Sequence, residues 1–257
     1  MMATSTARNQ APSDTSYDRN TELKAFDDTK AGVKGLVDAG LTKIPQIFIQ
    51  KPYIQLGDYS KCSIPVIDLE GVNKDATKRR EIIREIIEAC EKWGFFQVVN
   101  HGIPVTVLDE MIDGICRFHE QDTEEKKKLY TRDFNKRVLY LSNFRLYSSP
   151  AADWKDTLFC VMAPHTPDRD ELPAVCRLVA SKFFRRISGL MFPPKRGALI
   201  VNIGDLLQLI TNDRLKSVHH RVVARNVGPR ISVASFFRQQ IRKGSSLSGY
   251  GPIKELI

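Results

Sequence analysis

The residues best suited to chemistry lie in the segment Ser217 to Val223, which reads SVHHRVV and has the β-branched content of a strand. Alternate residues of a strand point to opposite faces, so His220 shares a face with Val218, and Arg221 lies on the other. Because arginine prefers water, we expect the Val218 face to be buried and His220 to be a buried imidazole. A single strand histidine is more often a hydrogen-bonded core residue than a functional group, so the pattern alone leaves both readings open.

A second polar pair follows on the next expected strand, Arg230 to Arg238. Arg230 and Ser232 share one face of that strand, and Phe236 continues the face, so we expect it to point inward. A guanidinium beside a hydroxyl matches the hydrogen-bonding needs of a carboxylate, which predicts a site for the distal end of a small dicarboxylate. An inward arginine can also belong to a structural ion pair, and this alternative stays open.

The elements that must position these residues are β-strands at the C-terminal end of the chain. Apolar and β-branched runs separated by turn residues predict four consecutive antiparallel strands. They cover Gly197 to Asn202, Leu206 to Thr211, Ser217 to Val223 and Arg230 to Arg238. We therefore expect a β-meander to carry His220, Arg230 and Ser232.

The first half of the chain is richer in helix. Apolar residues recur at helical spacing between Ala76 and Trp93 and again from Val105 to about Glu120. A weaker helix is expected from Thr21 to Asp38, and short strands are expected at 64–69 and 95–100. Helices followed by consecutive antiparallel strands predict an α+β fold.

Composition excludes several classes of protein. Of the 257 residues 42% are hydrophobic, yet no apolar run approaches the roughly 18 residues of a membrane span. The net charge of +9 is spread over short clusters without a nucleic-acid-binding motif, so we predict no nucleic acid and no membrane as partners. The polar residues 1–20 are expected to be disordered and lack a secretory core, which predicts a cytoplasmic protein.

The cysteines fit the same compartment. They are odd in number, widely spaced and never in a C-x-x-C pair, so we expect reduced thiols that serve as packing residues. They are Cys62, Cys90, Cys116, Cys160 and Cys176.

Two long stretches resemble the plant Fe(II)/2-oxoglutarate dioxygenases. The first contains IPVIDL at 64–69 and WGFFQVVNHGIP at 93–104, and the second contains NIGD, SVHHRV and PRIS between 202 and 232. Within that family, ELKAFDDTKAGVKGLVDAG, SNFRLYSSPAADWKDTL and GALIVNIGDLLQLITND are similar to the 1-aminocyclopropane-1-carboxylate oxidase homologues. The likeness covers residues 21 to about 177 and about 194 to 257.

This resemblance implies a helical cap domain and a double-stranded β-helix, or jelly-roll, core. It implies Fe(II) and 2-oxoglutarate as cofactors, with ascorbate as reductant, and a small-molecule substrate of plant specialised metabolism. By the same resemblance, His220 is the distal histidine of a two-histidine, one-carboxylate iron triad, and Arg230 and Ser232 bind the 5-carboxylate of 2-oxoglutarate. His101 belongs to the NHG motif and is expected to be structural.

The sequence departs from the family at its other iron ligands, which lie in a His-x-Asp motif. None of the five histidines has an acid two positions later. The likeness also breaks across residues 178–193, and the family's C-terminal helix is missing after Tyr250. We therefore expect a cap domain at 21–177, a junction at 178–193 where core strands are missing, and a partial core at 194–257.

The functional prediction is a family member that lacks activity, because one histidine cannot hold Fe(II) in a facial triad. The alternative is a non-catalytic binding or regulatory protein that keeps the carboxylate pocket of Arg230 and Ser232. Missing strands would also leave strand edges exposed, so we expect self-association to be possible.

Overall fold

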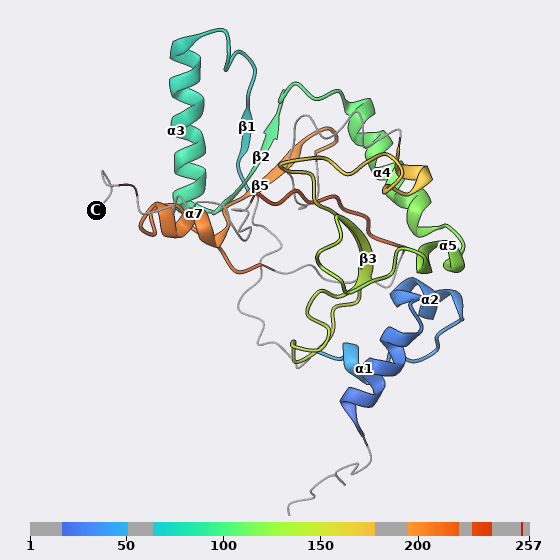
Figure 1. Cartoon of the computed structure of the whole chain (residues 1–257). Coiled ribbons are helices and arrows are strands. Elements are labelled where there is room, and N and C mark those ends of the chain that lie inside the picture. Colours follow the sequence, from blue (N-terminus) through green and yellow to red (C-terminus); the bar gives the residue numbers. More distant parts are fainter. Residues whose placement is uncertain (1–16, 51–63, 178–194, 221–227, 238–252, 254–257) are drawn as a thin grey trace, which may run out of the picture. The chain divides into compact units, whose positions relative to one another are not determined.

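The computed structural model describes residues 17–50, 64–177, 195–220, 228–237 and 253 (Figure 1). The chain divides into two compact units, and each unit is formed by two separate stretches of sequence. The first unit combines Met1–Tyr53 with Thr123–Phe159, and the second combines Ile54–Asp122 with Cys160–Ile257. Helices and small sheets are both present, so the predicted α+β class is confirmed.

The first unit contains short helices and a two-stranded sheet. The helices are α1 (Arg19–Asp28), α2 (Gly32–Asp38) and α5 (Thr123–Lys127), with a 3-10 turn, η1 (Gln46–Phe48). The sheet pairs β3 (Val138–Ser142) with β4 (Asp156–Cys160), whose last residue belongs to the second unit. Its core gathers Leu23, Phe26, Val33, Ile47, Phe48, Leu146 and Ala152, with Trp154 packed against it.

The helix predicted from Thr21 to Asp38 is two helices instead. The chain turns between α1 and α2 because Lys30 and Gly32 adopt positive φ angles of 54° and 68°. At this turn the N–H groups of Val33 and Lys34 donate to the two carboxylate oxygens of Asp156, both at 2.8 Å. A Cβ at position 32 would lie 2.4 Å from the same carboxylate, so glycine is required there. The expected single helix is therefore divided into α1 and α2 where the Asp156 carboxylate of β4 lies against the backbone.

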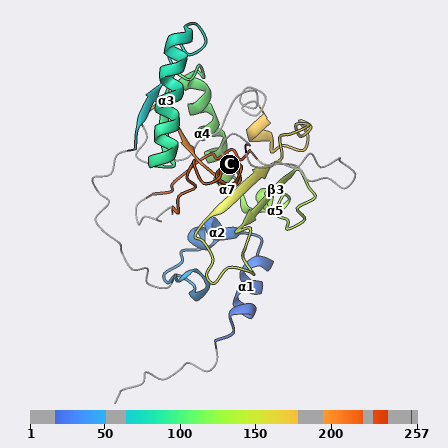
Figure 2. The same ribbon diagram turned by 90° about the vertical axis from the view of Figure 1, so that its left-hand side faces the viewer.

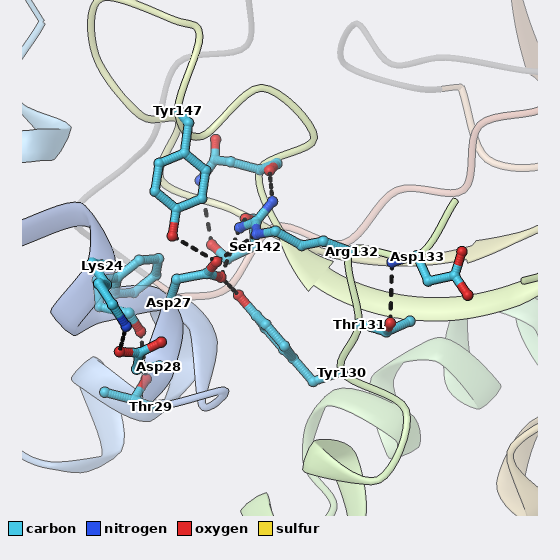
Figure 3. Close-up of polar contacts among 12 residues, drawn as sticks. Lys24, Asp27, Asp28, Thr29, Tyr130, Thr131, Arg132, Asp133, Ser142 and Tyr147 are labelled. Carbon is cyan, nitrogen blue, oxygen red and sulfur yellow. Dashed lines mark hydrogen bonds and ion pairs between the residues drawn. The ribbon is translucent and has the colours of Figure 1, made fainter. Parts of the chain in front are cut away.

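A hydrogen-bond network around Asp27 joins α1 to the segment before and after β3 (Figure 3). The Asp27 carboxylate accepts hydrogen bonds from Arg132 Nε at 2.6 Å and Nη2 at 2.8 Å. It also accepts from the hydroxyls of Tyr130 at 2.5 Å and Tyr147 at 2.9 Å. Arg132 in turn donates to the backbone carbonyls of Ser142 and Asn143, both at 2.9 Å. Because the side chains of Asp27 and Arg132 are only 13% and 22% exposed, this Asp27 network is a largely buried anchor of the first unit.

The second unit is built on a three-stranded sheet in the order β1 (Val66–Asp68), β2 (Phe95–Val99) and β5 (Leu199–Asn202). β1 runs parallel to β2 and β5 runs antiparallel to it, with Phe96 opposite Val201. The strands predicted at 64–69, 95–100 and 197–202 are therefore confirmed, and β1 is an outer strand of this sheet as expected.

Helices surround this sheet within the second unit. They are α3 (Ala76–Lys92), α4 (Val105–His119) and α7 (Asp205–Ile210), with a 3-10 turn, η2 (Ala174–Cys176). Both views show α3 alongside β1 (Figure 1, Figure 2). The apolar side of α3 contributes Ile82, Ala89 and Cys90 to a core that also contains Phe96 and Val98 of β2. The helices predicted from periodicity at 76–93 and 105–120 are thus confirmed.

The predicted β-meander is largely absent from the described residues. Residues 206–211, expected to be a strand, belong mostly to the helix α7, and residues 217–220 and 230–237 form no strand. The rest of the two last expected strands, 221–223 and 238, lies outside the described residues. β5 is the one predicted strand of this region that is found, and it pairs with β2 instead of with the segment that follows it.

Candidate functional site

His220 lies on the side of the sheet that faces away from α3. Neighbouring residues of β2 point to opposite faces of the sheet. Phe96 packs in the core with α3, so Phe95 points to the other face. The His220 ring packs edge-to-face on Phe95 with 5.0 Å between the ring centroids, and its Nδ1 lies 3.0 Å from the carbonyl oxygen of Val218. When Nδ1–H donates to a carbonyl, Nε2 keeps its lone pair, which is the usual arrangement of a metal-binding histidine.

The expected burial of His220 is wrong. The side chains of His219 and His220 are both exposed. Residues 217–220 form a loop, in which successive side chains do not alternate between core and solvent. This loop is fixed at its other end, where Lys216 N–H donates to the Cys90 carbonyl at 3.1 Å and Arg214 bonds Glu91 at 2.6 Å. His220 is therefore an exposed imidazole on an anchored loop.

Arg230 and Ser232 share one side of an extended segment, as the alternation predicted, but that side is exposed. Ile231 and Val233 are partly buried, and Val233 packs against the apolar cluster around Met111 of α4. The expected inward orientation of Arg230 and Ser232 is therefore corrected, because Ile231 and Val233 occupy the inner side. Neither Arg230 nor Ser232 has a hydrogen bond or ion pair with another described residue. No hydrogen-bond or ion-pair partner among the described residues therefore occupies their polar groups.

His101 uses both ring nitrogens within the second unit. Its Nδ1 accepts a hydrogen bond from Ile103 N–H at 3.2 Å, so Nε2 carries the proton and donates to the Gly197 carbonyl at 2.7 Å. This ties the loop after β2 to the start of β5. The hydrogen bonds agree with the structural role expected for His101.

A facial iron triad needs three ligands on one side of the metal. Among the residues that the structure describes, which include all five histidines, no three His, Cys, Asp or Glu side chains gather in a group that could hold a metal ion. His220 can offer one nitrogen, but it belongs to no three-ligand group among the described residues. The described residues therefore do not fit a resident Fe(II).

The cysteines behave as packing residues. Cys90, Cys116, Cys160 and Cys176 are free thiols, and Cys62 lies outside the described residues. Burial raises the pKa of Cys90 and of Cys176 to about 11, so these thiols stay protonated at neutral pH and are poor nucleophiles.

In the described part of the chain, no helix has the length and apolar character needed to cross a membrane.

Two features escaped the sequence analysis. The Asp27 network joins residues 105 positions apart, and no local pattern signals such a pair. The second feature is a group of aromatic rings, Phe134, Phe144 and Phe159, that contact one another near the surface of the first unit. The sequence offers only the aromatic residue types as a signal for this group.

Comparison with known proteins supports the resemblance on which the candidate site depends. The family model of the N-terminal region of non-haem dioxygenase in morphine synthesis matches residues 64–177, and the model of the 2OG-Fe(II) oxygenase superfamily matches residues 182–239. The chain is 41% identical to 1-aminocyclopropane-1-carboxylate oxidase homolog 1 of Arabidopsis thaliana over 326 residues, covering 96% of this chain and 89% of the relative.

A second relative, deacetoxyvindoline 4-hydroxylase of Catharanthus roseus, is 41% identical over 92% of this chain and 80% of its own length. The crystal structure of JOX2 in complex with 2OG, Fe and JA is similar in fold, with a TM-score of 0.58 and 20% identity over 72% of this chain and 76% of that one. The predicted likeness to the 1-aminocyclopropane-1-carboxylate oxidase homologues is confirmed. By these matches, the chain belongs to the 2OG-Fe(II) oxygenase superfamily.

Proposed function

We propose that this chain is a superfamily member that does not turn over 2-oxoglutarate, because its iron triad is incomplete. The observation that carries the proposal is the absence of a His-x-Asp pair from all 257 residues. The lack of a three-ligand group among the described side chains supports it. With His220 as its one family-type ligand, the chain would hold iron too weakly and with too many open positions to direct oxygen chemistry.

A shortened jelly-roll core is part of the same proposal. The alignment with the Arabidopsis homolog extends over 326 residues, which exceeds the 257 residues of this chain, so positions of the relative lack a counterpart here. Such a gap supports a cap domain at 21–177 joined through 178–193 to a partial core at 194–257. Missing strands would account for the loss of the His-x-Asp pair, since the family carries that pair on a core strand.

The proposal is tested by measuring succinate formation from 2-oxoglutarate with Fe(II) and ascorbate. We expect the purified chain to give no succinate above a protein-free reaction, while deacetoxyvindoline 4-hydroxylase, with deacetoxyvindoline as substrate, serves as the positive control. The matched variant is His220→Ala. Succinate formation that disappears in this variant would assign the activity to the chain and refute the proposal, whereas a trace that persists unchanged comes from a contaminant.

A second candidate function is metal-independent binding of a dicarboxylate. The exposed side chains of Arg230 and Ser232 favour it, because they lie on the same side of one segment and have no partner among the described residues. A guanidinium can form two parallel hydrogen bonds to a carboxylate, and a hydroxyl can add a third. The chain would then bind 2-oxoglutarate or a similar diacid without transforming it.

Calorimetric titration with 2-oxoglutarate in the presence of a chelator tests this candidate. We expect saturable binding that weakens about tenfold or more in Arg230→Ala, since a charge-assisted pair contributes about 1.5–3 kcal/mol. Arg79→Ala, which removes an exposed arginine from α3, is the matched control and should bind normally. Equal binding by the two variants would exclude Arg230 as the site.

A further inference from the structure

The first unit carries a small surface of aromatic rings, which we call the aromatic platform: Phe134, Phe144 and Phe159. Phe134 and Phe144 are stacked, with 5.9 Å between their centroids and 25° between their planes. Phe159 meets Phe144 edge-to-face at 5.4 Å and 77°. Phe134 is 55% exposed and Phe144 is 39% exposed. A ligand that covers these two adjacent rings would be stabilised, because apolar surface is then removed from water.

The turn that presents Phe144 is held rigidly. Asn143 has a positive φ angle of 61°, and its side chain accepts from Asp153 N–H at 2.7 Å and donates to the Asp153 carbonyl at 2.8 Å. On the other side of Phe144, Leu146 is fully buried in the core of this unit. The exposed ring is therefore fixed in place by its neighbours, and a ligand that stacks on it need not order a mobile loop.

The Asp27 network extends this rigidity to Phe134. Arg132 bonds both oxygens of Asp27 and the Asn143 carbonyl, so it ties the segment that leads to Phe134 to the turn that carries Phe144. Figure 3 shows Arg132 between Asp27 and the segment around Ser142. The two segments that carry the stacked rings are thus linked through Arg132.

The charges beside the rings favour an anionic partner. Lys136 and Arg145, which flank the two rings in sequence, are exposed and form no ion pair with another described residue. Asp133, the acid next to Phe134 in the sequence, accepts hydrogen bonds from the backbone N–H and the side-chain amide of Asn135. Stacking rings that are close in the sequence to cations without a described ion-pair partner suit a flat, conjugated molecule that carries a carboxylate.

We propose that the aromatic platform binds small planar aromatic carboxylates, with the ligand ring stacked on Phe134 and Phe144 and its carboxylate toward Lys136 or Arg145. The proposal is independent of the function proposed above, because it uses neither a metal nor Arg230. All of its residues lie in the first unit. A small ligand on an open surface is expected to bind weakly, with a dissociation constant on the order of 1 mM.

Ligand-observed NMR titration of the full chain with 1-naphthoate tests the proposal. We expect saturable binding, at least threefold weaker binding of the neutral 1-naphthamide, and at least threefold weaker binding of the non-planar cyclohexanecarboxylate. Phe134→Leu and Phe144→Leu keep apolar side chains at the surface but remove the stacking face, and each should weaken naphthoate binding about threefold to tenfold. Arg145→Gln should weaken naphthoate binding while leaving naphthamide binding unchanged.

Two control variants make the result specific. Phe236→Leu removes a phenyl ring that is 77% exposed and lies in the second unit, and Arg79→Ala removes an exposed arginine from α3. Both should bind naphthoate normally, and thermal unfolding should confirm that every variant is folded. Naphthoate binding that is lost in Arg230→Ala and retained in Phe134→Leu would refute the proposal. Dimerisation abolished by Phe144→Leu without any naphthoate binding would refute it too, since the rings would then serve a second copy of the chain.

Discussion

Replacing Arg132 by alanine is expected to lower the free energy of unfolding of the first unit by about 3 kcal/mol. The variant removes two charge-assisted hydrogen bonds to Asp27 and leaves the carbonyls of Ser142 and Asn143 without their donor. Removing one partner of a buried ion pair is more costly than the pair's own net contribution, because the remaining charge stays away from water. Arg132→Lys keeps the charge but cannot reproduce the bidentate geometry, so we expect an intermediate loss.

Tryptophan fluorescence during urea unfolding can report on this unit alone. The chain has two tryptophans, and Trp154 packs against Phe48 in the core of the first unit. In a Trp93→Phe background, the fluorescence of Trp154 therefore follows the unit that contains Arg132. The matched control is Lys128→Ala in the same unit, whose exposed ion pair with Glu125 should contribute less than about 1 kcal/mol. A loss in Arg132→Ala no larger than in the control would contradict a buried anchor.

The pH dependence of unfolding gives an independent check of the same network. Burial by itself raises the pKa of Asp27, but hydrogen bonds from Arg132, Tyr130 and Tyr147 outweigh burial and hold that pKa below its ordinary value. A carboxyl with a lowered pKa in the folded state stabilises the fold above its unfolded pKa of about 3.9, and this stabilisation is lost as the pH falls through the folded pKa. Asp27→Asn should therefore lose less stability than the parent chain between neutral pH and about pH 3.

Helical periodicity was the most reliable guide to this fold. The apolar residues of α3 and α4 recur at a spacing of three or four, and these long, regular patterns identify both helices. The buried strand β2 was equally clear, because FFQVV between two glycine-containing turns is aromatic and β-branched. Its pairing with β5, more than 100 positions away, could not be read from either strand.

The error at residues 206–211 has a physical origin. The run LLQLIT is short and apolar on nearly every position, so strand and helix periodicities fit it equally well. In the structure, Gly204 precedes a helix with Asp205 in its first turn, where a carboxylate suits the helix dipole. The Thr211 hydroxyl closes the last turn by donating to the Leu207 carbonyl at 2.8 Å. These end effects outweigh the strand preference expected from the apolar residues.

The sequence predicted one geometric feature of the candidate site. Alternation correctly grouped Arg230 with Ser232, because a period of two holds for any extended segment. It could not tell which side faces the core, since that depends on Val233 meeting the cluster around Met111 of α4. The loop that carries His220 is set by contacts with the end of α3, which are equally invisible in the local sequence.

Replacing Gly94 by alanine is expected to destabilise the second unit by roughly 2–4 kcal/mol and to displace the loop that carries His220. Gly94 has a φ of 65°, which is strained for any residue with a Cβ. A Cβ there would also lie 2.4 Å from the Lys216 carbonyl and 3.0 Å from a Val218 methyl group. Because the Lys216 carbonyl belongs to the anchored backbone, the loop must move to admit the methyl group. The edge-to-face contact of His220 with Phe95 should then be lost, together with the shift that the Phe95 ring imposes on the His220 ring protons in NMR spectra.

Two other glycines of the same unit separate the causes of this effect. Gly228 has a φ of 67° but open space around its Cβ position, so Gly228→Ala should cost only the backbone strain of about 1–2 kcal/mol. Gly204 has a φ of −97° and equally open space, and Gly204→Ala should change stability by less than about 0.5 kcal/mol. If Gly94→Ala matches Gly228→Ala in urea unfolding and leaves the His220 signals in place, the loop does not depend on its close approach to Gly94. A greater loss with displaced His220 signals would mean that the end of α3 fixes the position of this histidine.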